Sequence, residues 1–115
     1  MQPHNTYRVT FTRSIMQLAP NDLAAELEAK KTLRQSYPNV DFREYDVEVA
    51  FVEQRKETSC YEVFFRDHDY VSVPMIASGN GLEDVIDTIK CNYIKEHTDF
   101  GVTEAELTVE ELPYF

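Results

Sequence analysis

The segment from Glu44 to Phe51 alternates between acidic and apolar residues. Glu44, Asp46 and Glu48 alternate with Tyr45, Val47, Val49 and Phe51. Because successive side chains of a β-strand point to opposite faces, this spacing predicts a strand with an apolar face toward the core and a carboxylate face away from it. The chain is therefore expected to build a sheet that is covered on one face.

A second acidic row stands near the C-terminus, where Glu104, Glu106 and Glu110 alternate with Ala105, Leu107 and Val109. The two rows place much of the negative charge on the polar sides of sheet strands. An ordered, charged surface can recognise a partner, so these six acidic residues are the candidate partner-binding residues. Two alternative interpretations are that the charges protect edge strands from aggregation and that the acidity serves solubility alone.

The net charge of the chain is strongly negative. Its 115 residues include 21 Asp and Glu against 11 Lys and Arg, for a formal net charge of −10. Such a surface repels phosphate backbones, so the sequence predicts no direct binding to nucleic acid and favours a partner protein with a basic surface. The length predicts a single domain over residues 1–115, long enough to fold without a disulfide or a metal ion.

Features that would direct the chain out of the cytoplasm are not visible in the sequence. The first residues show no basic leader followed by an apolar run, and no stretch approaches the ~20 apolar residues of a membrane span. Cys60 and Cys91 are isolated and have no CxxC spacing. These features favour a cytoplasmic protein with reduced thiols and no membrane partner.

Residue periodicity predicts that the chain begins with a strand and a helix. Tyr7, Val9 and Phe11 alternate with polar residues, as in a strand. A helix is expected between Pro20 and Pro38, because proline fits the first turn of a helix and disfavours helical backbone in the residue before it. At helical spacing, the apolar stripe of this helix is expected to comprise Leu23, Leu27, Ala29, Leu33 and Tyr37.

Three more strands and a second helix are expected in the rest of the chain. Strands are predicted over residues 42–53 and 59–65, joined by a polar hairpin loop at 54–58, and a last strand over 102–112. The second helix is predicted from Asn80, which forms a capping box with Glu83. Its apolar stripe recurs at helical spacing and comprises Leu82, Val85, Ile86, Ile89 and Tyr93.

The fold class predicted by this order is α+β, with an antiparallel sheet of four or five strands and two helices packed on one face. Four strands give the ferredoxin-like order β-α-β-β-α-β. The uncertain segment is 70–76, which follows a predicted turn at 66–69. It could add a meander strand, although Pro74 lacks a ladder donor. In the ferredoxin-like order the second and fourth strands are edges, so the two acidic rows would flank the open face on the order of 14 Å apart.

No catalytic residue, cofactor or metal site is predicted. Asp67, His68 and Asp69 form the only dense cluster of metal-ligand types, and His97 with Asp99 is a second pair. Each set lacks the third or fourth ligand that a zinc site needs, and sequence spacing supplies none. Neither cysteine has a base or an orienting group nearby in the sequence.

Two classes of function are consistent with these features. The first is a non-enzymatic protein-binding module with a nucleic-acid-mimic surface, such as the inhibitors of nucleic-acid-handling proteins that phages and mobile elements encode, including anti-CRISPR proteins. The alternative is a ferredoxin-like dimer that binds or transforms a small molecule in a pocket between sheet and helices. A homodimer would form through the open sheet face.

Overall fold

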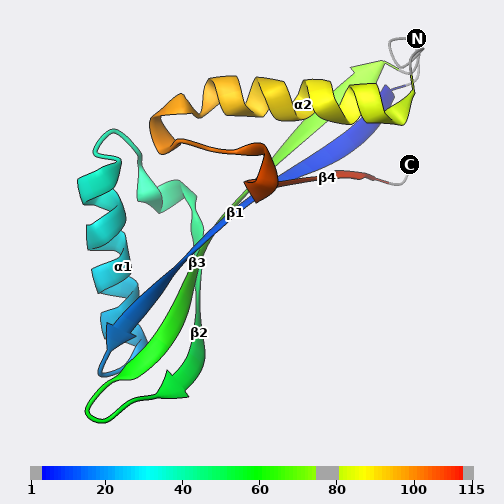
Figure 1. The fold of residues 1–115 in the computed structure, drawn as a ribbon. Helices are drawn as coiled ribbons and strands as arrows, with labels where there is room; N and C mark the ends of the chain where they lie inside the picture. The colour runs from blue at the N-terminus through cyan, green and yellow to red at the C-terminus, as the bar shows by residue number, and fades with distance from the viewer. Residues whose placement is uncertain (1–3, 75–80, 113–115) are drawn as a thin grey trace. The chain divides into compact units, whose positions relative to one another are not determined.

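The computed structural model describes residues 4–74 and 81–112, which form one four-stranded sheet and two helices (Figure 1). The elements in chain order are β1 (His4–Ala19), α1 (Asp22–Ser36), β2 (Asp46–Gln54), β3 (Ser59–Pro74), α2 (Leu82–Glu96) and β4 (Leu107–Glu111). The sheet is antiparallel. The predicted α+β fold with ferredoxin-like order β-α-β-β-α-β is therefore confirmed.

The strand order in the sheet is β2-β3-β1-β4, so β1 and β3 are central and β2 and β4 are edges, as predicted. β4 pairs with the first half of β1, with Val9 opposite Val109. β2 pairs with the first half of β3, with Val49 opposite Val63. The predicted polar hairpin loop joins β2 to β3, and the Arg55 amide donates to the Thr58 carbonyl at 2.8 Å.

The chain divides into two compact units, each with its own helix. The terminal unit comprises residues 1–11 and 68–115, and the middle unit comprises residues 12–67. β1 and β3 contribute residues to both units. That the chain is a single domain stays a prediction.

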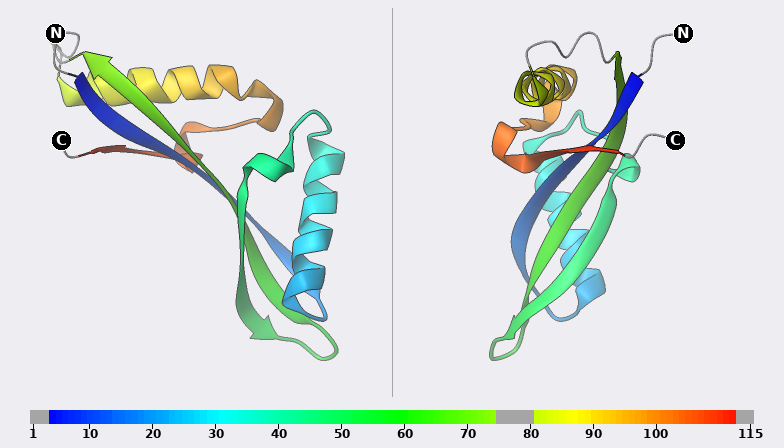
Figure 2. Two further views of the ribbon diagram at one scale, coloured as in Figure 1. Left: turned by 180° about the vertical axis from the view of Figure 1, so that it is seen from behind. Right: turned by 90° about the vertical axis from the view of Figure 1, so that its right-hand side faces the viewer.

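The core of the terminal unit lies between α2 and the sheet. Figure 2 shows α2 on one side of the strands of this unit. Phe11 of β1 is fully buried, and its ring centroid lies 5.2 Å from that of Phe100 and 6.4 Å from that of Tyr93. The buried apolar side chains of this unit are Tyr7, Val9, Phe11, Val85, Ile89, Tyr93, Phe100, Val102 and Leu107.

The core of the middle unit places α1 close to the sheet. Ala25 and Ala29 are fully buried, and their small side chains permit a close approach of the helix to the strands. Leu23 and Leu27 are 64% and 58% exposed, so their predicted place in the buried stripe is wrong. Ala29 and Leu33 of the predicted stripe are buried as predicted, and Ala25 is buried with them.

The largest difference from the prediction is the length of β3. The predicted turn at 66–69 is wrong, because β3 runs without a break from Ser59 to Pro74. β1 is equally long and lies next to β3, so the backbone of these polar residues has a partner strand. Tyr70–Pro74 therefore extends β3, and the described residues form no additional meander strand. The rest of the predicted segment, Met75 and Ile76, lies outside the described residues.

The second helix begins at Leu82, one residue later than the predicted cap implies. Gly81 is the N-cap, with φ of 101°, a conformation that glycine adopts without strain. The predicted cap, Asn80, lies outside the described residues. α2 ends at Glu96, and Gly101, with φ of 62°, closes the short 3-10 turn that follows.

Replacement of Phe11 tests this packing. Phe11→Ala should lower the free energy of unfolding by about 3–5 kcal/mol, because it leaves a cavity beside the rings of Tyr93 and Phe100. Phe51 is 60% exposed and serves as a matched control. Phe51→Ala should cost about 1 kcal/mol or less in the same urea titration. If the two variants lost the same free energy of unfolding, the assignment of Phe11 to the core of the terminal unit would be contradicted.

Candidate functional site

The first acidic row is interrupted before β2 begins. Glu44 lies in a 3-10 turn over Phe42–Glu44, so its predicted place on the strand is wrong. The Asp41 carboxylate accepts hydrogen bonds from the Arg43 amide, Nε and Nη2, each at 3.0 Å. These bonds fix the turn and, together with the Arg43 charge, hold the pKa of Asp41 below its usual value.

Asp46 and Glu48 lie on β2 and are exposed, as predicted. Glu48 Oε2 lies 3.3 Å from Arg66 Nη1 on the neighbouring strand, so a basic residue offsets part of this row. The apolar face of β2 is also shorter than predicted. The register shifts between Phe51 and Glu53, and Phe51 is exposed apart from an edge contact with Tyr61.

The second acidic row is interrupted by another 3-10 turn. Glu104 and Glu106 lie in this turn (Glu104–Glu106), so their predicted places on the last strand are wrong. Glu106 Oε1 accepts hydrogen bonds at 3.0 Å from the amide and from the hydroxyl of Thr103, which closes the turn. Glu104 Oε1 lies 4.0 Å from Lys90 Nζ.

Glu110 alone of this row lies on β4. Its carboxylate accepts a hydrogen bond from Arg8 on β1, and this contact raises the pKa of the Arg8 guanidinium. The two rows also belong to different units, because β2 lies in the middle unit and β4 in the terminal unit. Only Asp46, Glu48 and Glu110 of the six candidate residues are strand residues, and the role of all six in partner binding stays a prediction.

The sheet face opposite the helices carries polar contacts between strands. In the terminal unit, Thr10 Oγ1 lies 3.0 Å from His68 Nδ1. In the middle unit, the Ser14 hydroxyl donates to Glu62 at 2.8 Å. Phe64 shares this face with Glu62, because the alternate residues of β3, Tyr61, Val63 and Phe65, are buried. Phe64 therefore places an aromatic side chain on the open face of the middle unit.

The acidic charge is concentrated in the terminal unit. This unit holds ten Asp and Glu against three Lys and Arg, whereas the middle unit holds eleven against eight. The N-terminal half of α2 contributes three exposed acids, Glu83, Asp84 and Asp87. The strand rows did not reveal this asymmetry, but a charge count along the second helix and its flanks does.

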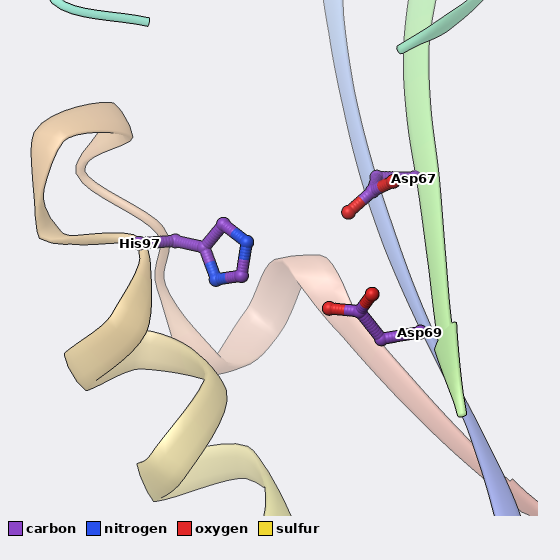
Figure 3. Close-up of side chains that lie close together, drawn as sticks. All are labelled: Asp67, Asp69 and His97. Atoms are coloured by element: carbon purple, nitrogen blue, oxygen red, sulfur yellow. The ribbon is translucent and has the colours of Figure 1, made fainter. Parts of the chain in front are cut away.

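Two residues of metal-ligand types, Asp69 and His97, lie close together in the terminal unit (Figure 3). Asp67 and Asp69 are two residues apart on one strand and therefore share a face. His97, the C-cap residue of α2, places a ring nitrogen within 4.8 Å of an Asp69 carboxylate oxygen. Sequence reasoning missed the group because it read 66–69 as a turn and paired His97 with Asp99.

A hollow of about 350 Å³ lies between α2 and the sheet in the terminal unit. Asp69, Asn92 and Glu96 supply polar groups to its wall. The apolar part of the wall comes from both the strands and the helix, and the complete lining is Val9, Asp69, Tyr70, Val71, Ile89, Asn92, Tyr93 and Glu96.

Comparison of the chain with protein-family models, curated protein sequences and solved structures gave no significant match. Among the described residues, neither helix combines the length and apolar character required to cross a membrane.

Proposed function

We propose that the chain is a non-enzymatic, cytoplasmic protein-binding module whose acidic terminal unit binds the basic surface of a partner. The observation that carries this proposal is the concentration of charge, ten acids against three basic residues, in that unit. In its most specific form, the partner is a nucleic-acid-handling protein, and the module inhibits it by occupying the surface that binds phosphates.

The physical basis is the electric field of a surface with one dominant sign. Exposed carboxylates attract a basic partner, raise the association rate and favour one orientation, and dissolved salt screens all three effects. Glu83, Asp84 and Asp87 stand together on exposed turns of α2. Three of the six residues predicted from the sequence, Glu104, Glu106 and Glu110, belong to this unit as well.

The middle unit fits this role less well. It holds Glu44, Asp46 and Glu48, but its eight basic residues offset most of its acidity. Arg66 contacts Glu48 directly. The proposal therefore moves the centre of the binding surface from the β2 row to α2 and its flanks.

Neutralising the acids of α2 tests the proposal. The wild-type chain, immobilised as bait in a lysate of cells that encode it, should retain a basic protein at low salt and release it as salt rises. The triple variant Glu83→Gln, Asp84→Asn and Asp87→Asn should retain at least about tenfold less, because each close charge contact across an interface contributes about 1.5 kcal/mol or more. Duplex DNA should compete with the bait for the retained protein.

A matched variant controls for the general loss of charge. Glu28→Gln, Glu44→Gln and Glu57→Gln remove three exposed acids from the middle unit and should leave retention unchanged. Circular dichroism verifies that both variants fold. Equal retention by wild type and the α2 variant, or retention that is indifferent to salt, contradicts the proposal.

A second candidate function rests on the hollow of about 350 Å³ in the terminal unit. Its volume lies in the range of small-molecule sites, and its wall combines apolar side chains with a few polar groups. A module with this hollow would bind a small polar or cationic compound, because Asp69 and Glu96 both line it.

Filling the hollow tests this second function. A library of small cationic compounds should contain ligands that raise the melting temperature of the wild type. Asn92→Trp, which adds bulk at the wall of the hollow, should abolish the rise, whereas Thr88→Trp one turn earlier on α2 should preserve it. A ligand that stabilises wild type and Asn92→Trp equally would show that it binds elsewhere.

A further inference from the structure

The outward side of α1 carries two exposed leucines followed by basic residues. The buried residues of this helix all lie on its other side, and they are Ala25, Ala29 and Leu33. At 3.6 residues per turn, the side turned away from them is exposed and comprises Leu23, Leu27, Lys31 and Arg34. Exposed apolar residues one helical turn apart are typical of a helix that docks on a partner. Along the chain, this side therefore runs from apolar to basic.

The outward side of α2 has the opposite arrangement. The buried residues of this helix are Val85, Ile89 and Tyr93. By the same helical geometry, the side turned away from them comprises Glu83, Asp84, Asp87, Cys91 and Ile94. The three acids are exposed, and Lys90, which lies among these residues in the sequence, is 4.0 Å from Glu104, so an acid offsets its charge. Along the chain, this side runs from acidic to apolar.

The two sides are complementary when the helices are antiparallel. In one register, kept to within one residue, the facing positions are Leu23 with Ile94, Leu27 with Cys91, Lys31 with Asp87 and Arg34 with Glu83. Apolar side chains then meet apolar side chains, and basic side chains meet acids. Parallel packing would instead set Leu23 and Leu27 against acids, and carboxylates buried against leucine are costly.

Charge complementarity identifies a second copy of the chain as the occupant of the outward side of α1. A surface that offers only acids would satisfy Lys31 and Arg34 but would leave the two leucines exposed. The outward side of α2 offers both the acids and the apolar positions at the matching spacing. The terminal unit that carries α2 also has the larger excess of negative charge, ten acids against three basic residues.

We propose that α1 of one copy packs antiparallel on α2 of a second copy. The leucines supply apolar burial, and the contacts of Lys31 and Arg34 with the acids of α2 set the orientation. This self-association does not rest on the proposed function, although it would occupy the acids to which a basic partner would bind. It is tested on the purified chain alone, so its failure would leave the proposed partner binding untouched.

Sedimentation velocity of the purified full chain tests the contact. The wild type should associate as its concentration rises, and added salt should weaken the association. The α1 reversal is the double variant Lys31→Glu and Arg34→Glu, and the α2 reversal is the double variant Glu83→Lys and Asp87→Lys. Each should raise the dissociation constant at least about tenfold, because like charges then face each other.

An equimolar mixture of the two reversal variants should recover association. The reversed α1 of one variant matches the reversed α2 of the other, and recovery also shows that both variants fold. As a matched control, Arg55→Glu with Lys56→Glu makes the same charge change in the exposed hairpin loop. This control should change the dissociation constant by less than about twofold.

Three sedimentation results would overturn the proposal. The first is a wild type that stays monomeric at every concentration. The second is a mixture of the reversal variants that associates no better than its components. The third is an association that survives both reversals, as a dimer formed through the open sheet face would.

Cross-linking locates the contact on the chain. Under mild oxidation, Leu27→Cys should form a disulfide with Cys91 of a second copy, because facing positions of packed helices come within disulfide reach. Cys91 is exposed, whereas Cys60 is buried. Glu57→Cys in the hairpin loop is the control and should form no disulfide to Cys91. Mass spectrometry of the digested dimer identifies the link, and a dimer joined only through the two introduced cysteines would contradict the contact between α1 and α2.

Discussion

The pairing of β1 with β3 is the constraint on which the rest of the structure depends. Both strands are 16 residues long, and they are neighbours at the centre of the sheet. Both edge strands attach to this pair, since β4 hydrogen-bonds to β1 and β2 to β3. In each unit the odd-numbered residues of these strands face the core, because the two-residue alternation runs on without a shift. Core and site positions on β3 follow from this one register.

The acidic rows show how local hydrogen bonding overrides a two-residue pattern. A carboxylate can accept from backbone amides, and a capped turn satisfies those amides better than an unpaired strand end does. Asp41 and Glu106 are used in this way, and each stabilises a 3-10 turn where alternation predicts a strand. The densest group of exposed acids, Glu83, Asp84 and Asp87, lies on α2. A two-residue strand pattern does not reveal this group, because it belongs to a helix.

The sequence specified the elements well and their extents less well. The second helix and the hairpin follow from strong local signals, namely an apolar stripe and a polar loop between two apolar runs. Leu23 and Leu27 were wrongly included in the buried stripe of α1 because a hydrophobicity pattern weights them above Ala25, whereas close packing against a sheet favours alanine. The residues Arg66–Asp69 resemble a turn in composition, yet the alternation of Val63 and Phe65 continues through them. The proximity of His97 to Asp69 depends on tertiary packing, which no local signal encodes.

The continuity of β3 is the central structural claim, because it places Asp67 and Asp69 on the core-facing side and His68 on the other. Backbone chemical shifts and nuclear Overhauser effects of residues 66–69 test it directly. The account predicts extended-strand carbon shifts throughout this segment and a cross-strand Overhauser effect between Thr10 and His68, whose side chains lie 3.0 Å apart. Turn-like shifts at 66–69 without that cross-strand effect would contradict it.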